Sequence, residues 1–242
     1  MRGYDLEQFE RNLDQLGCTL SSRQLDQFLD YYEILLEWNQ VMNLTAITEF
    51  HEVLEKHFVD SLSLVKLLPD LSLSDFSLID VGTGAGFPGI PLKIVFPNLR
   101  VTLLDSLNKR VKFLDEVIEK LSLKDIYAVH GRAEDFARKS EYRDHFDFCV
   151  SRAVANLSTL SEYCLPFVKK GGLFVSYKSE RIQEEAKNAR HALQLLGGEE
   201  EEWLSFLLPG SEMSRTLLPV RKKAPTPKKY PRKAGLPAKE PL

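Results

Sequence analysis

Residues 78–91 read LIDVGTGAGFPGIP, and this stretch decides the fold of the chain. Residues 77–81 form a short apolar run that is typical of a buried strand. Glycines follow within residues 82–86, and a helix is expected to begin near Ile90. Glycine lets the backbone approach a ligand closely, and a helix N-terminus offers unpaired N–H groups. Together these elements indicate a nucleotide site.

The spacing of the glycines indicates which nucleotide is bound. The dinucleotide fingerprint is G-x-G-x-x-G, whereas Gly82, Gly84 and Gly86 form G-x-G-x-G. Phe87 stands where the third glycine of the fingerprint belongs. This departure argues against NAD and favours S-adenosylmethionine, which has no pyrophosphate. A glycine turn that binds no ligand is the alternative.

Asp105 ends a second strand-like run, residues 100–104. In Rossmann-type folds, an acidic residue about 20 residues beyond the glycine turn accepts hydrogen bonds from the ribose hydroxyls. We therefore predict that Asp105 binds a ribose. The alternative is that Asp105 caps the helix that follows, and the two roles are compatible.

Hydrophobic periodicity predicts an α/β fold. Three helices are expected first, over residues 5–16, from about residue 22 to 39, and over residues 49–68. Strands and helices then alternate from residue 76, which predicts a Rossmann-like, doubly wound, mostly parallel sheet of seven strands. No helix separates the last two strands, near 202–208 and 215–221, so one of them is expected to be antiparallel.

Composition and length suggest three regions. We expect residues 1–70 to be a helical cap packed on the core, residues 71–223 to be the α/β domain, and residues 224–242 to be an extended or disordered tail with five prolines. The net charge is −3, yet residues 221–242 contain eight basic residues and one acidic residue. This uneven distribution points to a polyanionic partner.

Other features exclude several protein classes. No apolar run approaches the length of about 18 residues that a membrane span needs, and the N-terminus lacks the apolar region of a secretory signal. The three cysteines lie far apart without a C-x-x-C motif, so we expect buried thiols, no disulfide and no metal site. A cytoplasmic protein fits these features.

Seven segments carry a resemblance to a known family: WNQVMNLTAI (38–47), HFVDSL (57–62), DVGTGAGFPGIPL (80–92), LLDSLNKRVKFL (103–114), RAEDF (132–136), SRAVANL (151–157) and KKYPRKAGLP (228–237). They resemble the class I S-adenosylmethionine-dependent methyltransferases. More narrowly, they resemble the bacterial 16S ribosomal RNA guanine-N7 methyltransferases of the small subunit, also called glucose-inhibited division protein B. The resemblance extends over nearly the whole chain.

The resemblance implies a function. The chain is expected to transfer a methyl group from S-adenosylmethionine to N7 of a guanine in the 530-loop region of 16S ribosomal RNA. The expected partner is 16S ribosomal RNA or the small ribosomal subunit, with no metal, no membrane and a monomeric enzyme.

The resemblance also implies cofactor contacts at Gly82, Phe87, Ala133, Glu134 and Arg152, beside those expected at Gly84 and Asp105. Ala133 and Glu134 follow the third strand, where the adenine edge lies in this fold. Arg152 ends the fourth strand, at the crevice of open α/β sheets, and can hold the methionine carboxylate or an RNA phosphate. The alternatives are a helix first-turn acid for Glu134 and a surface ion pair for Arg152.

No residue is identified with certainty as catalytic. Arg152, His57 and Asp60 are candidates for positioning the substrate, with ordinary packing as the alternative for His57. The RNA-binding candidates are Lys178, Lys228, Lys229, Arg232 and Lys233. We expect the tail residues among them to contact phosphates and to leave cofactor affinity unchanged. Lys178 can instead simply end a strand in solvent.

The residues that end the fourth strand narrow the reaction. Residues 151–154 read SRAV, which lacks both the Asn/Asp-Pro-Pro-aromatic motif of exocyclic amine methylation and the Pro-Cys pair used on pyrimidine rings. A ring nitrogen or a hydroxyl remains as the acceptor. The alternative functions are a small-molecule methyltransferase and an RNA-binding assembly factor with a vestigial pocket.

Overall fold

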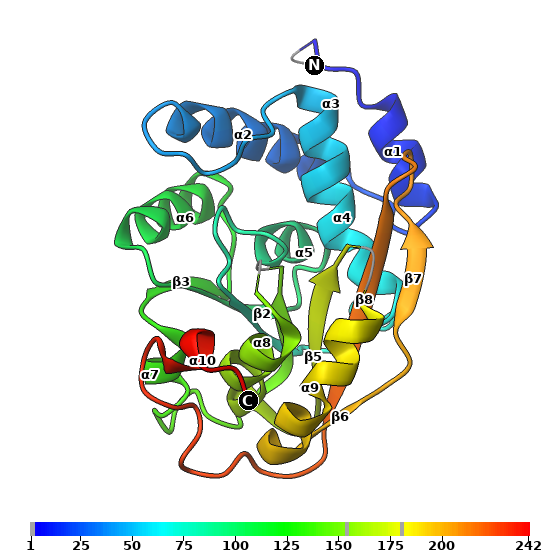
Figure 1. Ribbon diagram of the computed structural model, residues 1–242. Coiled ribbons are helices and arrows are strands. Elements are labelled where there is room, and N and C mark those ends of the chain that lie inside the picture. Colours follow the sequence, from blue (N-terminus) through cyan, green and yellow to red (C-terminus); the bar gives the residue numbers. More distant parts are fainter. Residues whose placement is uncertain (1–2, 153–154, 180–181) are drawn as a thin grey trace.

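The computed structural model describes residues 3–152, 155–179 and 182–242. The first helices form a cap, and a sheet with flanking helices follows (Figure 1). The cap consists of α1 (Glu7–Asp14), α2 (Ser22–Asn39) and an unbroken helical run made of α3 (Phe50–Val53), the π-helical turn η1 (Leu54–Val59), α4 (Asp60–Leu62) and the 3₁₀ turn η2 (Ser63–Lys66). The three helical segments expected from periodicity are therefore present.

The sheet contains eight described strands: β1 (Ser77–Val81), β2 (Arg100–Asp105), β3 (Ile126–His130), β4 (Phe146–Ser151), β5 (Val168–Lys178), β6 (Gly198–Glu200), β7 (Leu204–Leu207) and β8 (Ser214–Lys222). Their order is β3-β2-β1-β4-β5-β8-β6, and β7 also pairs with β8. The first five strands run parallel, and β8 is antiparallel to β5. The doubly wound, mostly parallel sheet is thus confirmed.

The number of strands differs from the prediction of seven. The expected strand near 202–208 is the short β7, and a further short strand, β6, pairs with the other end of β8. Beside β8, the place of a single edge strand is therefore taken by two short strands, β6 and β7, one after the other. Residues 201–203, which lie between them, are outside both strands.

Helices cover both faces of the sheet. They are α5 (Gly89–Val95), α6 (Asn108–Lys120), α7 (Ala133–Phe136), α8 (Leu157–Cys164), η3 (Leu165–Phe167), α9 (Gln183–Leu196) and α10 (Leu236–Lys239). The helix expected over residues 180–196 is α9, while Glu180 and Arg181 lie outside the described residues. Figure 1 shows α8 and α9 in front of the sheet.

Alternating side chains divide the core into two clusters. In β1, Leu78 belongs to the cluster shared with the cap, α5 and α6, whereas Ile79 and Val81 belong to the cluster shared with α8 and α9. Successive side chains of a strand point to opposite faces of the sheet, so a continuously apolar strand contributes side chains to both clusters. Cap residues and sheet residues lie in the same cluster, so the cap packs directly on the core.

The C-terminal segment differs from the expected extended or disordered tail. Residues 224–242 fold back along α7 and α8 and end in the short helix α10 (Figure 1). Tyr230 is buried, and Arg143 donates hydrogen bonds to the carbonyls of Thr226 and Tyr230. These contacts hold the segment against the α/β domain, so the prediction of an extended or disordered tail, which was based on its high proline content, is wrong.

Candidate active site

Asp80 organises the glycine turn. Its Oδ2 accepts hydrogen bonds from Thr83 Oγ1 at 2.7 Å and from the N–H of Gly89 at 2.9 Å. Gly82, with a φ of +72°, begins the turn in the left-handed region that glycine adopts without strain. Burial raises the pKa of Asp80 to about 6, although the two hydrogen bonds act in the opposite direction. Asp80 was not among the predicted site residues, and its one signal in the sequence is an acid inside an apolar run.

Asp105 joins the glycine turn to the end of β2. Oδ2 accepts the N–H of Gly84 at 2.9 Å, and Oδ1 accepts the N–H of Leu107, also at 2.9 Å. Arg110 lies 3.4 Å from Oδ2. Asp105 is 2% exposed, and Leu107 is the residue that precedes α6. The carboxylate therefore fixes the glycine turn and the residue before α6. The expected alternative, a cap on that helix, is not what the described structure has, because the N-cap position is Leu107 and no side chain caps it there.

A cavity of about 230 Å³ lies where the glycine turn faces the ends of β2 and β3. Gly82, Leu104, Ala133, Glu134 and Tyr163 are among its lining residues. Three of the predicted cofactor residues, Gly82, Ala133 and Glu134, thus come together. We call this cavity the cofactor crevice.

The cofactor crevice suits S-adenosylmethionine by the chemistry of its lining. Glu134 lines the crevice with a buried carboxylate, and the buried carboxylate of Asp105 belongs to the residue between the lining residues Leu104 and Ser106. Both are acceptors, and the ribose hydroxyls and adenine amine of the cofactor are donors. Leu104 and Leu160 supply apolar walls for the base. A Cβ added at Gly84 would meet no atom within 4 Å, so open space lies beside the turn. These residues fit the cofactor.

Phe87 and Arg152, which the sequence also predicted as cofactor contacts, lie outside the crevice lining and contact the cap. Phe87 is buried against the cap, and its ring stacks on His57 with the centroids 4.7 Å apart. The guanidinium carbon of Arg152 lies 5.0 Å from the centroid of the same ring, within the range of a cation–π contact. The two residues therefore form the boundary between the crevice side and the cap.

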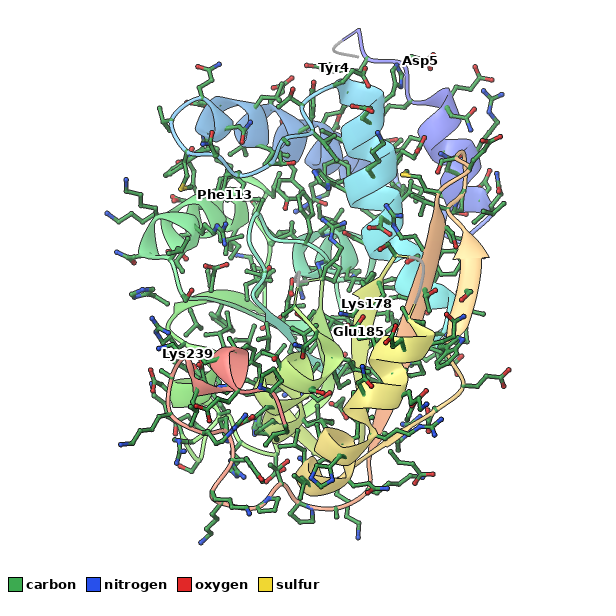
Figure 2. All side chains as sticks on the ribbon, viewed as in Figure 1. Tyr4, Asp5, Phe113, Lys178, Glu185 and Lys239 are labelled. Atoms are coloured by element: carbon green, nitrogen blue, oxygen red, sulfur yellow. The ribbon has the colours of Figure 1, made fainter. Side chains whose placement is uncertain are left out.

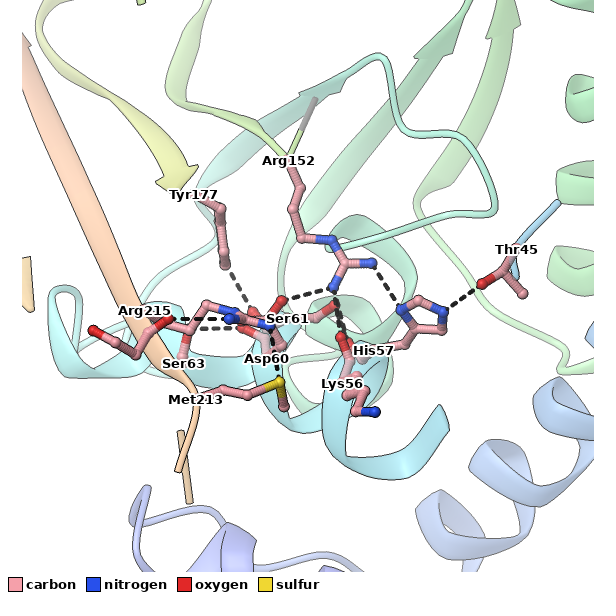
Figure 3. Close-up of polar contacts among 11 residues, drawn as sticks. Thr45, Lys56, His57, Asp60, Ser61, Ser63, Arg152, Tyr177, Met213 and Arg215 are labelled. Carbon is pink, nitrogen blue, oxygen red and sulfur yellow. Dashed lines mark hydrogen bonds and ion pairs between the residues drawn. The ribbon is translucent and has the colours of Figure 1, made fainter. Parts of the chain in front are cut away.

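Arg152, His57 and Asp60 form one polar cluster (Figure 3). Arg152 Nη1 donates to Asp60 Oδ2 at 3.0 Å, and Nη2 lies 3.3 Å from Nδ1 of His57. Arg215 of β8 donates from Nε to Asp60 Oδ1, also at 3.0 Å. Each oxygen of Asp60 therefore binds one arginine, Arg215 from β8 and Arg152, the residue that follows β4.

The contacts of His57 define its tautomer. Arginine can only donate, so Nδ1 of His57 accepts from Arg152. Nε2 then carries the proton and donates to Thr45 Oγ1 at 2.8 Å. Burial, and secondly the charge of Arg152, lower the pKa of His57 to about 3. His57 is thus neutral near pH 7, with both ring nitrogens engaged.

The π-helical turn η1 presents His57 to this cluster. Such turns interrupt regular helices and are frequent at functional sites. Lys56 and His57 both lie in η1, and Arg152 Nη1 also donates to the carbonyl of Lys56 at 3.2 Å. The sequence analysis placed His57 and Asp60 in one helix but had no signal for this turn.

A second cavity, of about 720 Å³, opens over the polar cluster. Its lining includes Lys56, Asp60, Arg152, Lys178 and Arg215, and Ala155 lines both this cavity and the cofactor crevice. The two cavities are therefore neighbours. We call the larger one the substrate pocket, since its size is within the usual range for ligand sites.

Lys178 is part of the pocket wall. Its Nζ donates to Glu185 Oε1 at 2.6 Å and to the carbonyl of Ala155 at 2.7 Å. Figure 2 shows Lys178 and Glu185 side by side. The side chain of Lys178 is 11% exposed, so it does not end the strand in solvent. Its charge is instead paired at the rim of the substrate pocket.

The basic C-terminal segment is partly neutralised by the protein itself. Arg232 pairs with Glu162 at 2.7 Å, and Arg221 pairs with Glu201 at 2.8 Å. Lys222 is buried beside Asp144, and burial lowers its pKa to about 8. Arg232 therefore forms an ion pair within the protein, whereas the sequence analysis predicted that it would contact RNA. Three other candidates are exposed: Lys228, Lys229 and Lys233.

Arg215 and Thr45 are the cluster members that the sequence analysis missed. Arg215 lies 155 residues beyond Asp60, and no local pattern distinguishes it from other strand arginines. Thr45 lies within the segment 38–47 that carried the family resemblance, which was its only signal. Asn39 Oδ1 accepts the backbone N–H groups of Leu44 and Thr45 and so orders this loop.

The described residues contain no group of three or more histidine, cysteine, aspartate or glutamate side chains arranged to hold a metal ion. Within the same residues, no helix has the length and apolar character needed to cross a membrane. The three cysteines are buried, as predicted, and the structure has them as free thiols.

Comparison with known proteins identifies close relatives. The model of the rRNA small subunit methyltransferase G family, GidB, matches residues 24–214. A protein of Lachnoclostridium phytofermentans named ribosomal RNA small subunit methyltransferase G is 55% identical over 238 residues, which is 98% of each chain. A protein of Acetivibrio thermocellus with the same name is 54% identical and covers 93% of this chain and 92% of its own.

Solved structures share the fold. TYW2 of M. jannaschii in complex with AdoMet matches with a TM-score of 0.50 and 14% identity, over 66% of this chain and 75% of its own. The [4+2]-cyclase SpnF matches with a TM-score of 0.51 and 13% identity, over 66% of this chain and 80% of its own. Because one of these is a cyclase, the shared fold alone does not determine the reaction.

Proposed function

The chain belongs to the rRNA small subunit methyltransferase G family, and from this premise we propose that it methylates N7 of a guanine in the 530-loop region of 16S ribosomal RNA. It is an enzyme, an S-adenosylmethionine-dependent rRNA methyltransferase. S-adenosylmethionine supplies the methyl group from its sulfonium. What we propose beyond this activity is the acceptor atom, guanine N7, and the target region, the 530 loop.

The cofactor crevice is the proposed cofactor site. Asp105 accepts from the ribose hydroxyls, and the Ala133–Glu134 segment binds the adenine edge. Gly82 and Gly84 let the backbone approach the methionine moiety, while Phe87 and Arg152 close the side that faces the substrate pocket. Arg152, whose guanidinium lies in the substrate pocket beside Asp60, is proposed to hold the carboxylate of the cofactor.

The state of His57 supports a ring nitrogen as the acceptor. A general base needs a free lone pair, yet Nδ1 of His57 accepts from Arg152 and Nε2 donates to Thr45. Asp60, the nearest acid, binds Arg152 and Arg215. Guanine N7 carries an exposed lone pair and no proton, so its methylation requires no base. This observation carries the proposal.

The residues of the substrate pocket then act by positioning. Orientation of two reactants with exclusion of water can supply several kcal/mol of a barrier, roughly 7–11 in the best cases. The methyl transfer leaves positive charge on the purine, so Asp60 helps by balancing the nearby arginines. Lys56, Lys178 and Arg215 line the pocket, each paired with an acidic side chain, and we propose that they orient RNA phosphates from there.

The exposed lysines of the C-terminal segment are the proposed RNA contact. Lys228, Lys229 and Lys233 bind phosphates without sequence preference, and the pocket selects the base. We propose that the enzyme acts in the cytoplasm as a monomer on 16S ribosomal RNA or on the small subunit. The two alternative functions explain less. A small-molecule methyltransferase would not need these exposed lysines, and an RNA-binding assembly factor would not need an intact cofactor crevice.

One experiment tests the acceptor. Ribosomal RNA from a strain that lacks the protein is digested and compared by mass spectrometry with RNA from the complemented strain. We expect one 7-methylguanosine to be missing, and mapping of the fragment to place it in the 530 loop. Loss of a methyl group on another atom would contradict N7, and unchanged RNA would favour the assembly factor.

A further inference from the structure

The C-terminal segment reaches the cofactor crevice. The N–H of Gly235 donates to Oε1 of Glu134 across 2.8 Å. Glu134 lines the crevice and is 5% exposed. The two residues lie 101 positions apart in the chain, so only the return of the C-terminal segment to α7 brings them together (Figure 1).

A buried ion pair anchors this segment before Gly235. Arg232 donates to Glu162 from Nε at 3.0 Å and from Nη2 at 2.7 Å, and the backbone N–H of Arg232 donates to Oε1 at 2.7 Å. Glu162, on α8, is 0% exposed. A buried carboxylate needs such charged donors, and removal of them is strongly unfavourable. Arg232 is therefore held firmly on α8.

A second set of contacts anchors the segment after Gly235. Thr159, also on α8, donates from Oγ1 to the carbonyl of Pro237 at 3.0 Å. Arg232 Nη2 donates in addition to the carbonyl of Glu240 at 2.7 Å, which closes residues 232–240 into a loop. We call residues 232–240 the C-terminal strap. It is attached to α8 on both sides of the one residue that contacts Glu134.

The strap connects two walls of the crevice. Helix α8 contributes Leu160 and Tyr163 to the crevice lining, and α7 contributes Ala133 and Glu134. By binding α8 through Arg232 and α7 through Gly235, the strap sets the position of one wall relative to the other. Helix α7 has only four residues and therefore benefits from an external support.

We propose that the C-terminal strap is a positioning element of the cofactor site, which holds the Glu134 carboxylate through the Gly235 N–H and leaves Oε2 to accept the adenine amine. The proposal rests on the proposed function of the crevice. A carboxylate held in its binding orientation loses less conformational freedom when the cofactor arrives, so affinity increases. The segment that carries the RNA-binding lysines thus also supports cofactor binding, which differs from the independence expected from the sequence.

The first test removes the Gly235 donor. Gly235→Pro abolishes the N–H, and proline cannot adopt the φ of +83° found there. We expect calorimetry to show about tenfold weaker S-adenosylmethionine binding, a typical coupling between sites. Gly235→Ala is the matched control: it keeps the N–H and its Cβ meets no atom within 4 Å, but it too carries backbone strain at a φ of +83°. The difference between the two variants therefore reports on the N–H rather than on strain alone. Gly235→Ala should bind S-adenosylmethionine several-fold better than Gly235→Pro.

A double-mutant cycle separates this role from general stabilisation. If the strap acts through Glu134, Gly235→Pro should have little further effect on affinity in a Glu134→Ala background, which has no acceptor for the Gly235 N–H. Equal losses in both backgrounds would overturn the proposal. A second variant, Glu162→Gln with Arg232→Gln, loosens the anchor without leaving a buried charge unpaired, and it should also weaken binding.

The outcomes also separate this proposal from the proposed function. If the wild-type protein fails to bind S-adenosylmethionine, the cofactor site is wrong, and the strap proposal is overturned with it. If the wild type binds and Gly235→Pro binds equally well while its melting temperature is unchanged, only the strap proposal is overturned.

Discussion

The ring of His57 stacks on the ring of Phe87, with centroids 4.7 Å apart and planes 19° apart. Phe87 belongs to the glycine turn and His57 to the cap, so this contact joins the cofactor side of the molecule to the substrate side. Because Arg152 and Thr45 engage the ring nitrogens of His57, its apolar face is what supports Phe87. We therefore expect substitutions at His57 to act through geometry.

The first prediction concerns pH. The single-turnover rate with saturating cofactor and RNA should be nearly constant from pH 7 to pH 9, because the pKa of His57 is lowered to about 3 and N7 needs no base. His57→Ala should lower the rate at every pH and leave the profile flat. A rise with unit slope that disappears in His57→Ala would sink the mechanism and point to an acceptor that carries a proton.

The second prediction concerns the cofactor. Asp105→Ala should weaken S-adenosylmethionine binding at least tenfold, since a hydrogen bond to a charged group contributes about 1.5–3 kcal/mol. The same change frees the Gly84 and Leu107 N–H groups, which adds to the loss. Calorimetry measures the affinity, and circular dichroism verifies that the variant folds. An unchanged dissociation constant would remove Asp105 from the site.

The third prediction concerns stability and Asp80. Its pKa in the folded protein, about 6, lies above the ordinary value of 3.8 because burial disfavours the charged form. Between these values the folded state binds more protons than the unfolded state, so this group makes the protein less stable as pH rises from 4 to 6. Above pH 6 the loss of folding free energy caused by the raised pKa of Asp80 is constant, about 3 kcal/mol.

Asp80→Asn tests this directly. The amide oxygen can still accept from Thr83 and Gly89, and the amide nitrogen replaces Oδ1, which has no hydrogen-bond partner among the described residues. Urea unfolding should show the difference in stability moving in favour of Asp80→Asn by about 3 kcal/mol between pH 4 and pH 8. A difference that does not change with pH would mean that Asp80 titrates normally.

The fourth prediction concerns RNA. Replacement of Lys228, Lys229 and Lys233 by alanine should weaken RNA binding and reduce the slope of log K against log salt by about 2, because each phosphate contact on a single strand contributes about 0.7. Cofactor affinity should not change, since none of the three contacts Glu134. The matched control replaces Lys124, Lys170 and Lys187, which are exposed elsewhere. An equal salt slope in both triple variants would locate the RNA contact on another surface.

The sequence was sufficient for the features that depend on neighbouring residues. Apolar runs at residues 77–81 and 100–104 predicted β1 and β2. The order of strands and helices implied a parallel sheet, in which the ends of adjacent strands meet at one edge. For that reason, Gly82, Asp105 and Glu134 could be grouped as neighbours before any coordinates were considered.

Only the tertiary structure decided which charges are paired. Arg232 reads as one more basic residue of a proline-rich tail, yet it neutralises Glu162 on α8, 70 residues away. Arg215 shares Asp60 with Arg152, and the N–H of Gly235 supports Glu134. Local periodicity and turn chemistry depend on a few adjacent residues, so a sequence reports them. Pairing across the fold depends on where distant segments cross, and that is fixed by how the cap, the sheet and the C-terminal segment pack together.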